Sequence, residues 1–453
     1  MPRFICDLHI HSRYAQGCSK ETTIALLEQW ARVKGVDVLG TGDFTHPKWR
    51  EELQRELVQE RDGVLFTKSG YPFLLTTELS LVYTQDGRGR RVHVLLLAPS
   101  WNAVDRITAY LLAHGRIDYD GRPIFKIPAW RLVKDLAAID AMIEVIPAHA
   151  WTPWFSLFGS KSGFDSLREC FLDQTDRIHA IETGLSSDIA MNDRLSQLEG
   201  VRFVSFSDAH SYWPWRLGRE ATIFELQELT YPGIIDAIRT GEGLWGTIEV
   251  EPSYGKYHVD GHRACNVRFE PAESRLNQGK CPVCGGELTI GVLSRVEELA
   301  DRKARDGGES QRSLKLLPLH EILSLVLGKG MATKTVTETY GKLLATGKHE
   351  YDVLLNVPEA TLAAASTPAL AKAIVAVRNG EVSFTPGYDG VYGVPSLAGV
   401  SLPVSKAREV SSDDASRTSE TRGRVTIVDP ERKGRKGKAD GAPKVQKGLG
   451  DFI

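Results

Sequence analysis

Residues 4–17 read FICDLHIHSRYAQG, an apolar run that ends in two histidines, His9 and His11. On a β-strand, residues i and i+2 point to the same face. Both imidazoles therefore face the same way from one strand end, which suits a metal ion. For this stretch alone, a pair of surface histidines is an equally good interpretation.

The composition sets limits on what the chain can be. Its 453 residues, 42% hydrophobic and 25% charged, are enough for a large core and one or two smaller domains. A formal net charge of −2 excludes a generally basic protein, so any surface for nucleic acid has to be local. The six cysteines are too few for a disulfide scaffold, and no apolar run approaches ~18 residues. We expect a cytoplasmic, nucleoid-associated protein with no membrane partner.

Short β-type runs alternate with amphipathic stretches up to about residue 250. The stretches 22–35 and 107–115 have helical spacing of their apolar residues. The β-type runs are 4–10, 36–44, 73–83, 91–98, 141–150, 177–184 and 202–210. Alternating β and α units favour a mostly parallel sheet, and seven of them predict an α/β fold with a distorted seven-stranded βα barrel.

Residues of metal-binding type follow the ends of these runs. They are His9, His11, Asp43, His46, Glu78, His93, His149, Glu182, Asp208 and His210. Glu182 is either a ligand or the acceptor that fixes a histidine tautomer, and His93, which lies within a run, has a core histidine as its alternative. One tetrahedral zinc needs only four ligands. The set therefore predicts two or three divalent ions (Zn, Mn or Mg) and phosphoester hydrolysis.

Six segments, DLHIHS, GTGDFTH, TTELS, VHVLLL, PAHAW and SFSDAH, follow one another in the order of the ligand segments of the polymerase and histidinol phosphatase superfamily. The resemblance covers about the first 250 residues and implies a distorted βα barrel with a trinuclear metal site. It carries the ligand role to His9, His11, Asp43, Glu78, His93, His149, Asp208 and His210. We expect Asp208, His149 and His210 to act in catalysis. The chain departs from the pattern at Gln16 and Phe44, and His46 is the candidate replacement.

A second metal site is predicted after the barrel. Cys281-Pro-Val-Cys284-Gly-Gly is a knuckle that places two thiolates around one zinc, and His262 with Cys265 repeats the spacing. His258 is the alternative fourth ligand. Free thiols in a loop would leave the turn sequence unexplained, so we predict one structural zinc.

Residues from about 310 to 395 have helical spacing, and three of the stretches end in glycine. Beyond residue 400 the composition becomes polar and includes a basic stretch. The predicted parts are a catalytic barrel at 1–250, a zinc-binding domain at 251–308, a helical domain at 309–398, a disordered polar linker at 399–445 and a sliding-clamp-binding peptide at 446–453.

Aromatic and polar residues flank two of the ligand segments, and as a group they suit a nucleobase and its phosphates. They are Trp151, Trp154, Ser160, Lys161, Ser162, Trp213 and Arg216. Residues 159–167 also read as a Gly-Ser loop that leads into a helix N-terminus, which favours an anion. For any single aromatic residue, packing is the alternative.

The barrel, zinc segment, helical part and tail together resemble the endonuclease Q family of DNA repair nucleases. The resemblance implies cleavage of DNA on the 5′ side of deaminated bases (uracil, hypoxanthine, xanthine) or abasic sites. Two other hypotheses use the same ligands: a small-molecule phosphatase of the histidinol-phosphate kind, and a non-catalytic DNA-binding adaptor.

The last eight residues read QKGLGDFI. Leu449 and Phe452 are three apart and would share one face of a helical turn. With Gln446 and Ile453 they resemble the peptide by which repair proteins bind a sliding clamp, PCNA-like or bacterial. A frayed terminus with chance apolar residues is the alternative.

Overall fold

The structure is a computed structural model that describes residues 1–303 and 311–397. The chain divides into two compact units, and every described residue belongs to the first, Met1–Asp414. The described portions of the predicted barrel, zinc-binding domain and helical domain therefore share one unit. The predicted linker and the clamp-binding residues Gln446, Leu449, Phe452 and Ile453 lie outside the described residues.

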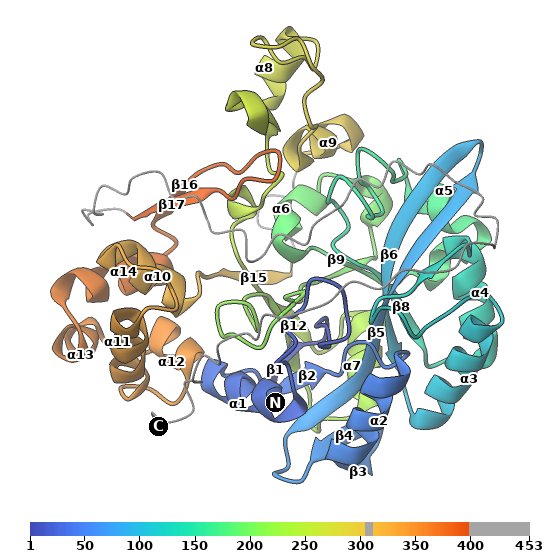
Figure 1. Ribbon diagram of the computed structural model, residues 1–453, viewed down its shortest axis with the longest axis horizontal. Helices are drawn as coiled ribbons and strands as arrows, with labels where there is room; N and C mark the ends of the chain where they lie inside the picture. The colour runs from blue at the N-terminus through green and yellow to red at the C-terminus, as the bar shows by residue number, and fades with distance from the viewer. Residues whose placement is uncertain (304–310, 398–453) are drawn as a thin grey trace, which may run out of the picture. The chain divides into compact units, whose positions relative to one another are not determined.

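Eleven strands form the main sheet of the described part, with the long β5–β6 ladder prominent in it (Figure 1). The path across the sheet runs through β15 (Arg312–Lys315), β12 (Leu244–Glu249), β11 (Ala221–Glu225), β1 (Arg3–Asp7), β2 (Val38–Gly40), β5 (Pro72–Gln85), β4 (Val64–Thr67) and β3 (Leu57–Arg61). Three further strands pair off this path: β6 (Arg88–Ala98), β7 (Ile124–Phe125) and β8 (Glu144–Pro147). The sheet is mixed, because β1 runs parallel to β2 and antiparallel to β11.

The α/β class was predicted correctly, but the mostly parallel, closed barrel was wrong. β9 (Ala180–Glu182) and β10 (Arg202–Val204) form a separate two-stranded sheet, so the hydrogen-bonded main sheet does not close. Both strands are only three residues long and have few backbone groups for a second ladder. Beside β10 a side chain takes the place of strand pairing: Ser205 N donates to Thr222 Oγ1 at 3.0 Å, and this hydroxyl donates to Ser205 O at 2.9 Å.

Apolar side chains from the strands nevertheless meet in two buried clusters, each of which joins strands from both sheets. Cys6, Val38, Leu74 and Val204 are fully buried in one cluster, and α7 (Tyr231–Thr240) covers them. Alternation along the strands sends these residues to one side, while neighbours such as Leu39, Phe73 and Leu75 pack in the other cluster. The strands are thus arranged around a common interior although their ladders do not close.

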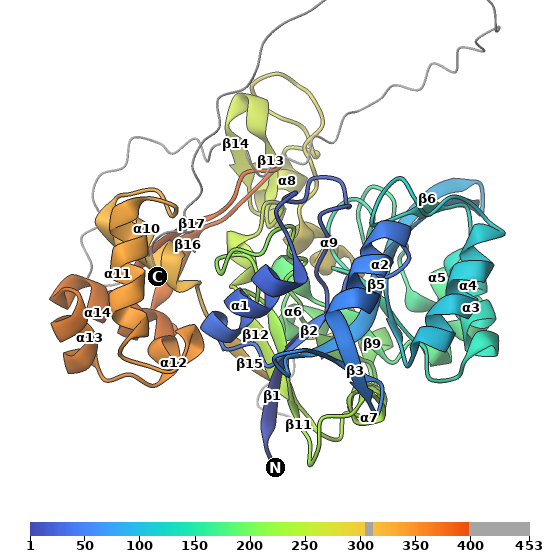
Figure 2. The same cartoon turned by 60° about the horizontal axis from the view of Figure 1, so that its bottom comes forward.

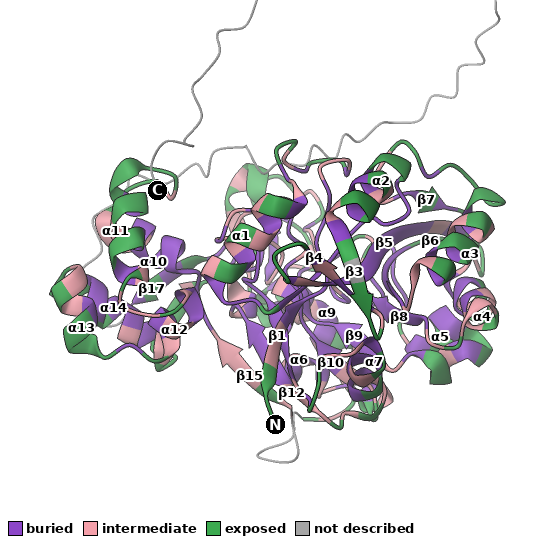
Figure 3. Ribbon diagram, turned by 90° about the horizontal axis from the view of Figure 1, so that it is seen from below, coloured by how far each residue is buried: buried purple, intermediate pink, exposed green. Residues whose placement is uncertain are grey.

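Helices cover the outer faces of the sheet. α1 (Ile24–Lys34) begins where Thr23 Oγ1 accepts from Leu26 N at 3.2 Å and ends at Gly35, whose φ of 93° suits glycine. The remaining helices of this part are α2 (Pro47–Glu56), α3 (Trp101–Leu112), α4 (Ala129–Ile139), α5 (Leu167–Phe171) and α6 (Ile189–Asn192). Their buried faces lie against the sheet and their exposed faces point outward (Figure 3).

The zinc-segment elements lie together, as Figure 2 shows for β13, β14 and α8. They are β13 (Asp260–His262), β14 (Val267–Phe269), α8 (Pro271–Leu276) and α9 (Val292–Leu299).

The helical part comprises α10 (Leu319–Leu327), α11 (Lys334–Leu344), α12 (Glu350–Leu355), α13 (Glu359–Ala365), α14 (Pro368–Arg378) and the hairpin β16 (Val382–Thr385) with β17 (Val394–Leu397). β15 pairs with β12, so a strand assigned from sequence to the helical domain belongs to the main sheet. Among the described helices, none has the length and hydropathy needed to cross a membrane.

Candidate metal centres and active site

Ten predicted ligands lie in or directly after the strands of the fold. Glu78 lies in β5, His93 in β6, and Glu182 is the last residue of β9. The others follow strands: His9 and His11 after β1, Asp43 and His46 after β2, His149 after β8, and Asp208 and His210 after β10. Segments far apart in sequence thereby bring most of these side chains to one place.

The first group consists of His9, His11, Glu78 and Asp208, whose donor atoms all lie within 4.8 Å of one another. His11 Nε2 is 3.0 Å from Glu78 Oε2 and 3.1 Å from Asp208 Oδ1. His9 Nε2 is 3.5 Å and 3.6 Å from the same two oxygens. Two imidazole nitrogens and two carboxylate oxygens therefore converge on one point.

The second group consists of Glu78, His93 and His149, again within 4.8 Å. His93 Nδ1 is 2.8 Å and His149 Nε2 is 3.2 Å from Glu78 Oε1. The two oxygens of Glu78 thus face different groups, Oε2 the first and Oε1 the second. A carboxylate in this position can bridge two divalent ions.

The buried polar atoms of the first group test whether a metal fits. His9 Nε2, His11 Nε2 and Asp208 Oδ1 are buried and have no hydrogen-bond partner among residues 1–303 and 311–397. Buried polar atoms without partners are costly and rare. Imidazole and carboxylate donors are the ligands of zinc, manganese and related divalent ions. The donor set therefore fits a divalent metal.

Two carboxylates hold the other nitrogens of His9 and His11. His9 Nδ1 lies 3.0 Å from Glu182 Oε1, and His11 Nδ1 lies 3.0 Å from Asp43 Oδ1. Glu182 Oε2 also accepts from His149 N at 2.7 Å. Such contacts fix the tautomer and leave Nε2 of each ring free to bind a metal. Glu182 and Asp43 are therefore placed to orient the rings of His9 and His11.

Two further predicted ligands lie outside both groups. His46 stacks on Tyr14, with ring centroids 4.5 Å apart. His210 packs against His11, with centroids 4.7 Å apart, and its Nδ1 lies 2.9 Å from Asp208 O. His210 is thus beside the first group, whereas His46 is on its periphery.

Charges around Glu78 favour its ionised form. Burial opposes ionisation, but neighbouring positive charge holds the pKa of Glu78 well below its ordinary value. Two neighbours supply that charge: Arg122, and His9, where burial opposes protonation but Glu182 and Glu78 raise the pKa well above its ordinary value. Burial lowers the pKa of His93 to about 3 and leaves that ring neutral. Burial also lowers the pKa of His210. Although burial opposes this, carboxylates of the site raise the pKa of His9 and His11 well above the ordinary value, so a bound metal would displace a proton from each of these rings.

Three site residues have left-handed backbone, which non-glycine residues seldom adopt. Their φ angles are 43° at Asp43, 32° at His149 and 48° at Asp208. Strain of this kind gathers at functional sites, where the surrounding fold holds it in place. It aims each side chain inward immediately after its strand.

The predicted zinc ligands also lie together. Donor atoms of His262, Cys265, Cys281 and Cys284 are within 4.8 Å of one another, and His262 Nδ1 is 3.4 Å from Cys284 Sγ. His258 is not in this group. Burial opposes ionisation of Cys281, but the N–H groups of Cys284 and Val283 lower its pKa to about 6, which favours the thiolate that binds metal.

Two solved structures resemble this geometry over most of the chain. The crystal structure of a lesion-specific endonuclease, PfuEndoQ from Pyrococcus furiosus, matches at a TM-score of 0.78 and 33% identity, covering 87% of this chain and 96% of that one. A structure of endonuclease Q with a 27-mer duplex carrying an abasic lesion matches at 0.79 and 33%, covering 88% and 97%. The chain belongs to the endonuclease Q family.

Two curated sequence relatives of this endonuclease Q family member are described as uncharacterised proteins. The protein MJ0043 of Methanocaldococcus jannaschii is 36% identical over 250 residues, which are 54% of this chain but only 31% of that protein. YqxK of Bacillus subtilis is 29% identical over 412 residues, 87% of this chain and 99% of YqxK. A family described as the MJ0043 C-terminal domain matches residues 318–381, the region of α10 to α14.

The predicted DNA-binding residues differ in exposure. Trp151 is 1% exposed and its Nε1 donates to Asn192 Oδ1 at 2.7 Å, so its ring has no free face. Trp154 is 36% exposed and packs edge-on against Tyr257, while Trp213 is partly buried and stacks on Trp215.

The Gly-Ser loop also presents few free groups. Lys161 is exposed, whereas Ser162 is buried and accepts from Phe155 N, and Ser160 Oγ donates to Ile290 O at 3.3 Å. The helix that follows, α5, is capped by Ser166, whose Oγ accepts from Glu169 N. Its first turn therefore has its own acceptor, and Lys161 remains as the accessible group. Arg216 is half-buried on the loop after His210.

The loop 211–219, which follows the last two predicted ligands, is held by the helical part. Lys34 of α1 is fully buried and donates to Pro214 O at 2.9 Å and to Glu350 Oε1 of α12 at 2.6 Å. The ring of Trp215 packs against α10. The helical part therefore touches the segment that carries Trp213 and Arg216.

Sequence reasoning missed two residues at the site. Arg122 Nη1 donates to Glu78 Oε2 at 3.0 Å, and Ser156 Oγ lies 3.0 Å from His149 Nδ1. Arg122 comes from a turn-like stretch, YDGRP at 119–123, which has no periodicity or motif that predicts its position. Ser156 follows His149 by seven residues, and only the fold of that loop brings the two together.

Proposed function

We propose that this chain is a metal-dependent DNA repair endonuclease. It hydrolyses the phosphodiester on the 5′ side of deaminated bases (uracil, hypoxanthine, xanthine) or abasic sites. The observation that carries the proposal is the convergence of unpartnered buried donors around Glu78 in a member of the endonuclease Q family. The relative solved with an abasic duplex supports DNA with a damaged base as the substrate.

Two divalent ions (Zn, Mn or Mg) would be held by His9, His11, Glu78 and Asp208 and by Glu78, His93 and His149, the sets that the geometry groups. Bound divalent ions lower the pKa of water and stabilise charge on phosphoryl oxygens. A third ion has no comparable group among the described residues. A structural zinc would be held by His262, Cys265, Cys281 and Cys284.

Residues of the chain would orient the metal-binding histidines and exclude bulk water from the metal groups. Glu182 and Asp43 keep the metal-binding nitrogens of His9 and His11 pointed at the centre. Asp208 is 32% exposed and His149 14%, so these two side chains, with the neighbouring His210, face the opening where a phosphate enters. The other members of the first group are fully buried, which excludes bulk water from that side.

DNA would be held outside the metal groups. Lys161, Trp154, Trp213 and Arg216 are accessible or partly accessible on loops that follow His149 and His210. A damaged base pairs weakly and costs less to flip, and aromatic rings are suited to stack on a flipped base.

Direct cleavage assays test the proposal. The protein is incubated with Mg²⁺ or Mn²⁺ and duplexes that carry one uracil, hypoxanthine or abasic site, and the cut is mapped at nucleotide resolution, with the undamaged duplex as control. We expect one incision, 5′ to the lesion. Hydrolysis of a phosphomonoester without any incision would favour the phosphatase hypothesis.

Tethering to a sliding clamp is a further part of the proposal. Gln446, Leu449, Phe452 and Ile453 would form the binding peptide, as their spacing predicts. The double variant Leu449→Ala, Phe452→Ala should lose clamp association while it cuts short oligonucleotides at the parent rate. Unchanged clamp binding in this variant would contradict the assignment.

A further inference from the structure

One charged side chain at the site belongs to neither metal group. Arg122 lies between α3 and β7, and its Nη1 donates to Glu78 Oε2 at 3.0 Å. The same oxygen is 3.0 Å from His11 Nε2. The guanidinium therefore borders the first group at the carboxylate that also faces the second.

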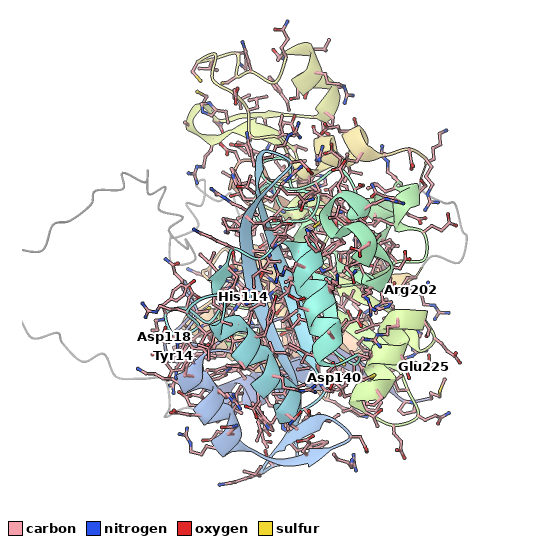
Figure 4. The ribbon with its side chains drawn as sticks, turned by 90° about the vertical axis from the view of Figure 1, so that its right-hand side faces the viewer. Tyr14, His114, Asp118, Asp140, Arg202 and Glu225 are labelled. Atoms are coloured by element: carbon pink, nitrogen blue, oxygen red, sulfur yellow. The ribbon has the colours of Figure 1, made fainter. Side chains whose placement is uncertain are left out.

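The loop that carries Arg122 is packed closely against the site. Gly121 N donates to Tyr14 O at 3.3 Å, and Tyr14 and Asp118 are labelled at the same edge of the molecule in the view of Figure 4. A Cβ at Gly121 would lie 2.2 Å from Asp43 Oδ2, so only glycine allows this approach. The backbone thus fixes the position from which Arg122 reaches Glu78.

Arg122 has donors to spare. A guanidinium carries five N–H donors in a rigid fork. Within the described ranges, its side chain donates to Glu78 alone, and none of its nitrogens is among the buried atoms that lack a partner. The side chain is 24% exposed, whereas that of Glu78 is fully buried. The remaining donors are therefore open to a ligand that enters the site.

Charge balance indicates what that ligand is. A permanent cation beside two sites for divalent cations is unfavourable unless an anion lies between them. Arg122 faces the carboxylates Glu78, Asp208 and Asp120, and the first two of these also face the metal group. A phosphodiester brings a further negative charge, which two divalent ions and Arg122 can share.

We propose that Arg122 is a catalytic residue that binds a non-bridging oxygen of the scissile phosphate and stabilises the charge that develops there. This inference deepens the proposed function and rests on it for the identity of the substrate. A guanidinium recognises phosphate oxygens in a bidentate manner, which a lysine ammonium cannot reproduce.

Variants of two arginines on one loop test the assignment. Arg116 pairs with Asp118 and its side chain is 74% exposed, so Arg116→Gln is the matched control. We expect Arg122→Gln to slow cleavage of a lesion-bearing duplex about 100-fold, with bound metal and thermal midpoint unchanged. Arg122→Lys should fall between Arg122→Gln and the parent, and Arg116→Gln should match the parent. Parent-like cleavage by Arg122→Gln overturns the proposal, and so does loss of its metal, since Arg122 would then serve only to hold Glu78.

A second measurement does not depend on cleavage. Inorganic phosphate is titrated into the metal-loaded parent and the metal-loaded Arg122→Gln variant by calorimetry, and we expect at least about tenfold weaker binding by the variant. If the parent fails to cut damaged DNA but this difference holds, the proposed function fails and the anion site stands. Equal phosphate affinity in the two proteins overturns the role of Arg122.

Discussion

The group around Glu78 and the group around Cys281 are equally compact, but they are assembled from very different lengths of chain. The first takes residues from His9 to Asp208, and its side chains are largely buried. The second lies within residues 262–284, and Cys284 is exposed. A large core surrounds the first group and holds its ligands, whereas a short segment has little core of its own. We therefore expect metal to serve chemistry at the group around Glu78 and to serve folding at the group around Cys281.

The largest effect should follow from removing a ligand at the strand ends. Asp208→Asn keeps the size of the side chain but removes its charge from the first group. Cleavage of a lesion-bearing duplex should fall at least about 1,000-fold, because metal-ion catalysis is lost. The thermal midpoint and the affinity for DNA should remain close to those of the parent, since phosphate contacts elsewhere hold the duplex. Full activity in this variant would remove metal from the mechanism.

A ligand of the predicted zinc site around Cys281 should instead affect folding. Cys281→Ser removes one thiolate, and structural zinc contributes about 10 kcal/mol or more to the folding of small metal-bound segments. Amides of residues 257–291 should lose protection in hydrogen exchange, while those of the main sheet stay protected. If the zinc segment of the Cys281→Ser protein is as protected as in the parent, metal at this site does not serve folding.

An intermediate effect should come from an orienting carboxylate. Glu182→Gln keeps the size of the side chain and one of the two acceptor oxygens that face His9 Nδ1 and His149 N, but removes the other oxygen and the negative charge. Loss of such partners typically costs 10–100-fold in metal affinity or activity, so we expect a loss of about this size. Metal titration with the cleavage rate as a second readout measures it. A loss as large as that of Asp208→Asn would make Glu182 a ligand and not an orienting residue.

The smallest effect sharpens the assignment of the zinc ligands. His258 was the alternative to His262 on sequence alone, but it lies outside the group. His258→Gln should retain one zinc per chain, whereas His262→Gln should lose it or bind it weakly. Metal content by mass spectrometry compares the two variants, and the reverse result would exchange the roles of these histidines.

The difference between the two groups also explains what sequence could predict. The knuckle spacing of Cys281 and Cys284 indicated the zinc site directly, because ligands that are close in the chain must be close in space. The alternation of β and α segments predicted the α/β class and showed which residues end strands. It did not predict whether the sheet closes. Closure depends on whether β9 and β10 pair with strands of the main sheet, and in the structure they pair with each other instead.

By itself, the sequence determined that histidines and carboxylates accompany successive strands, that a four-ligand knuckle follows, and that a group of helices comes after it. Only the tertiary structure decided which of the ten predicted ligands converge and which orient. Asp43, Glu182 and Glu78 are carboxylates of one predicted ligand set, yet the oxygens of Asp43 and Glu182 lie against Nδ1 of histidines, whereas Glu78 faces both metal groups of the strand ends. Arg122 is the clearest case. Its side chain reaches Glu78 because its loop packs on Tyr14 and Asp43, and no local pattern of residues carries that information.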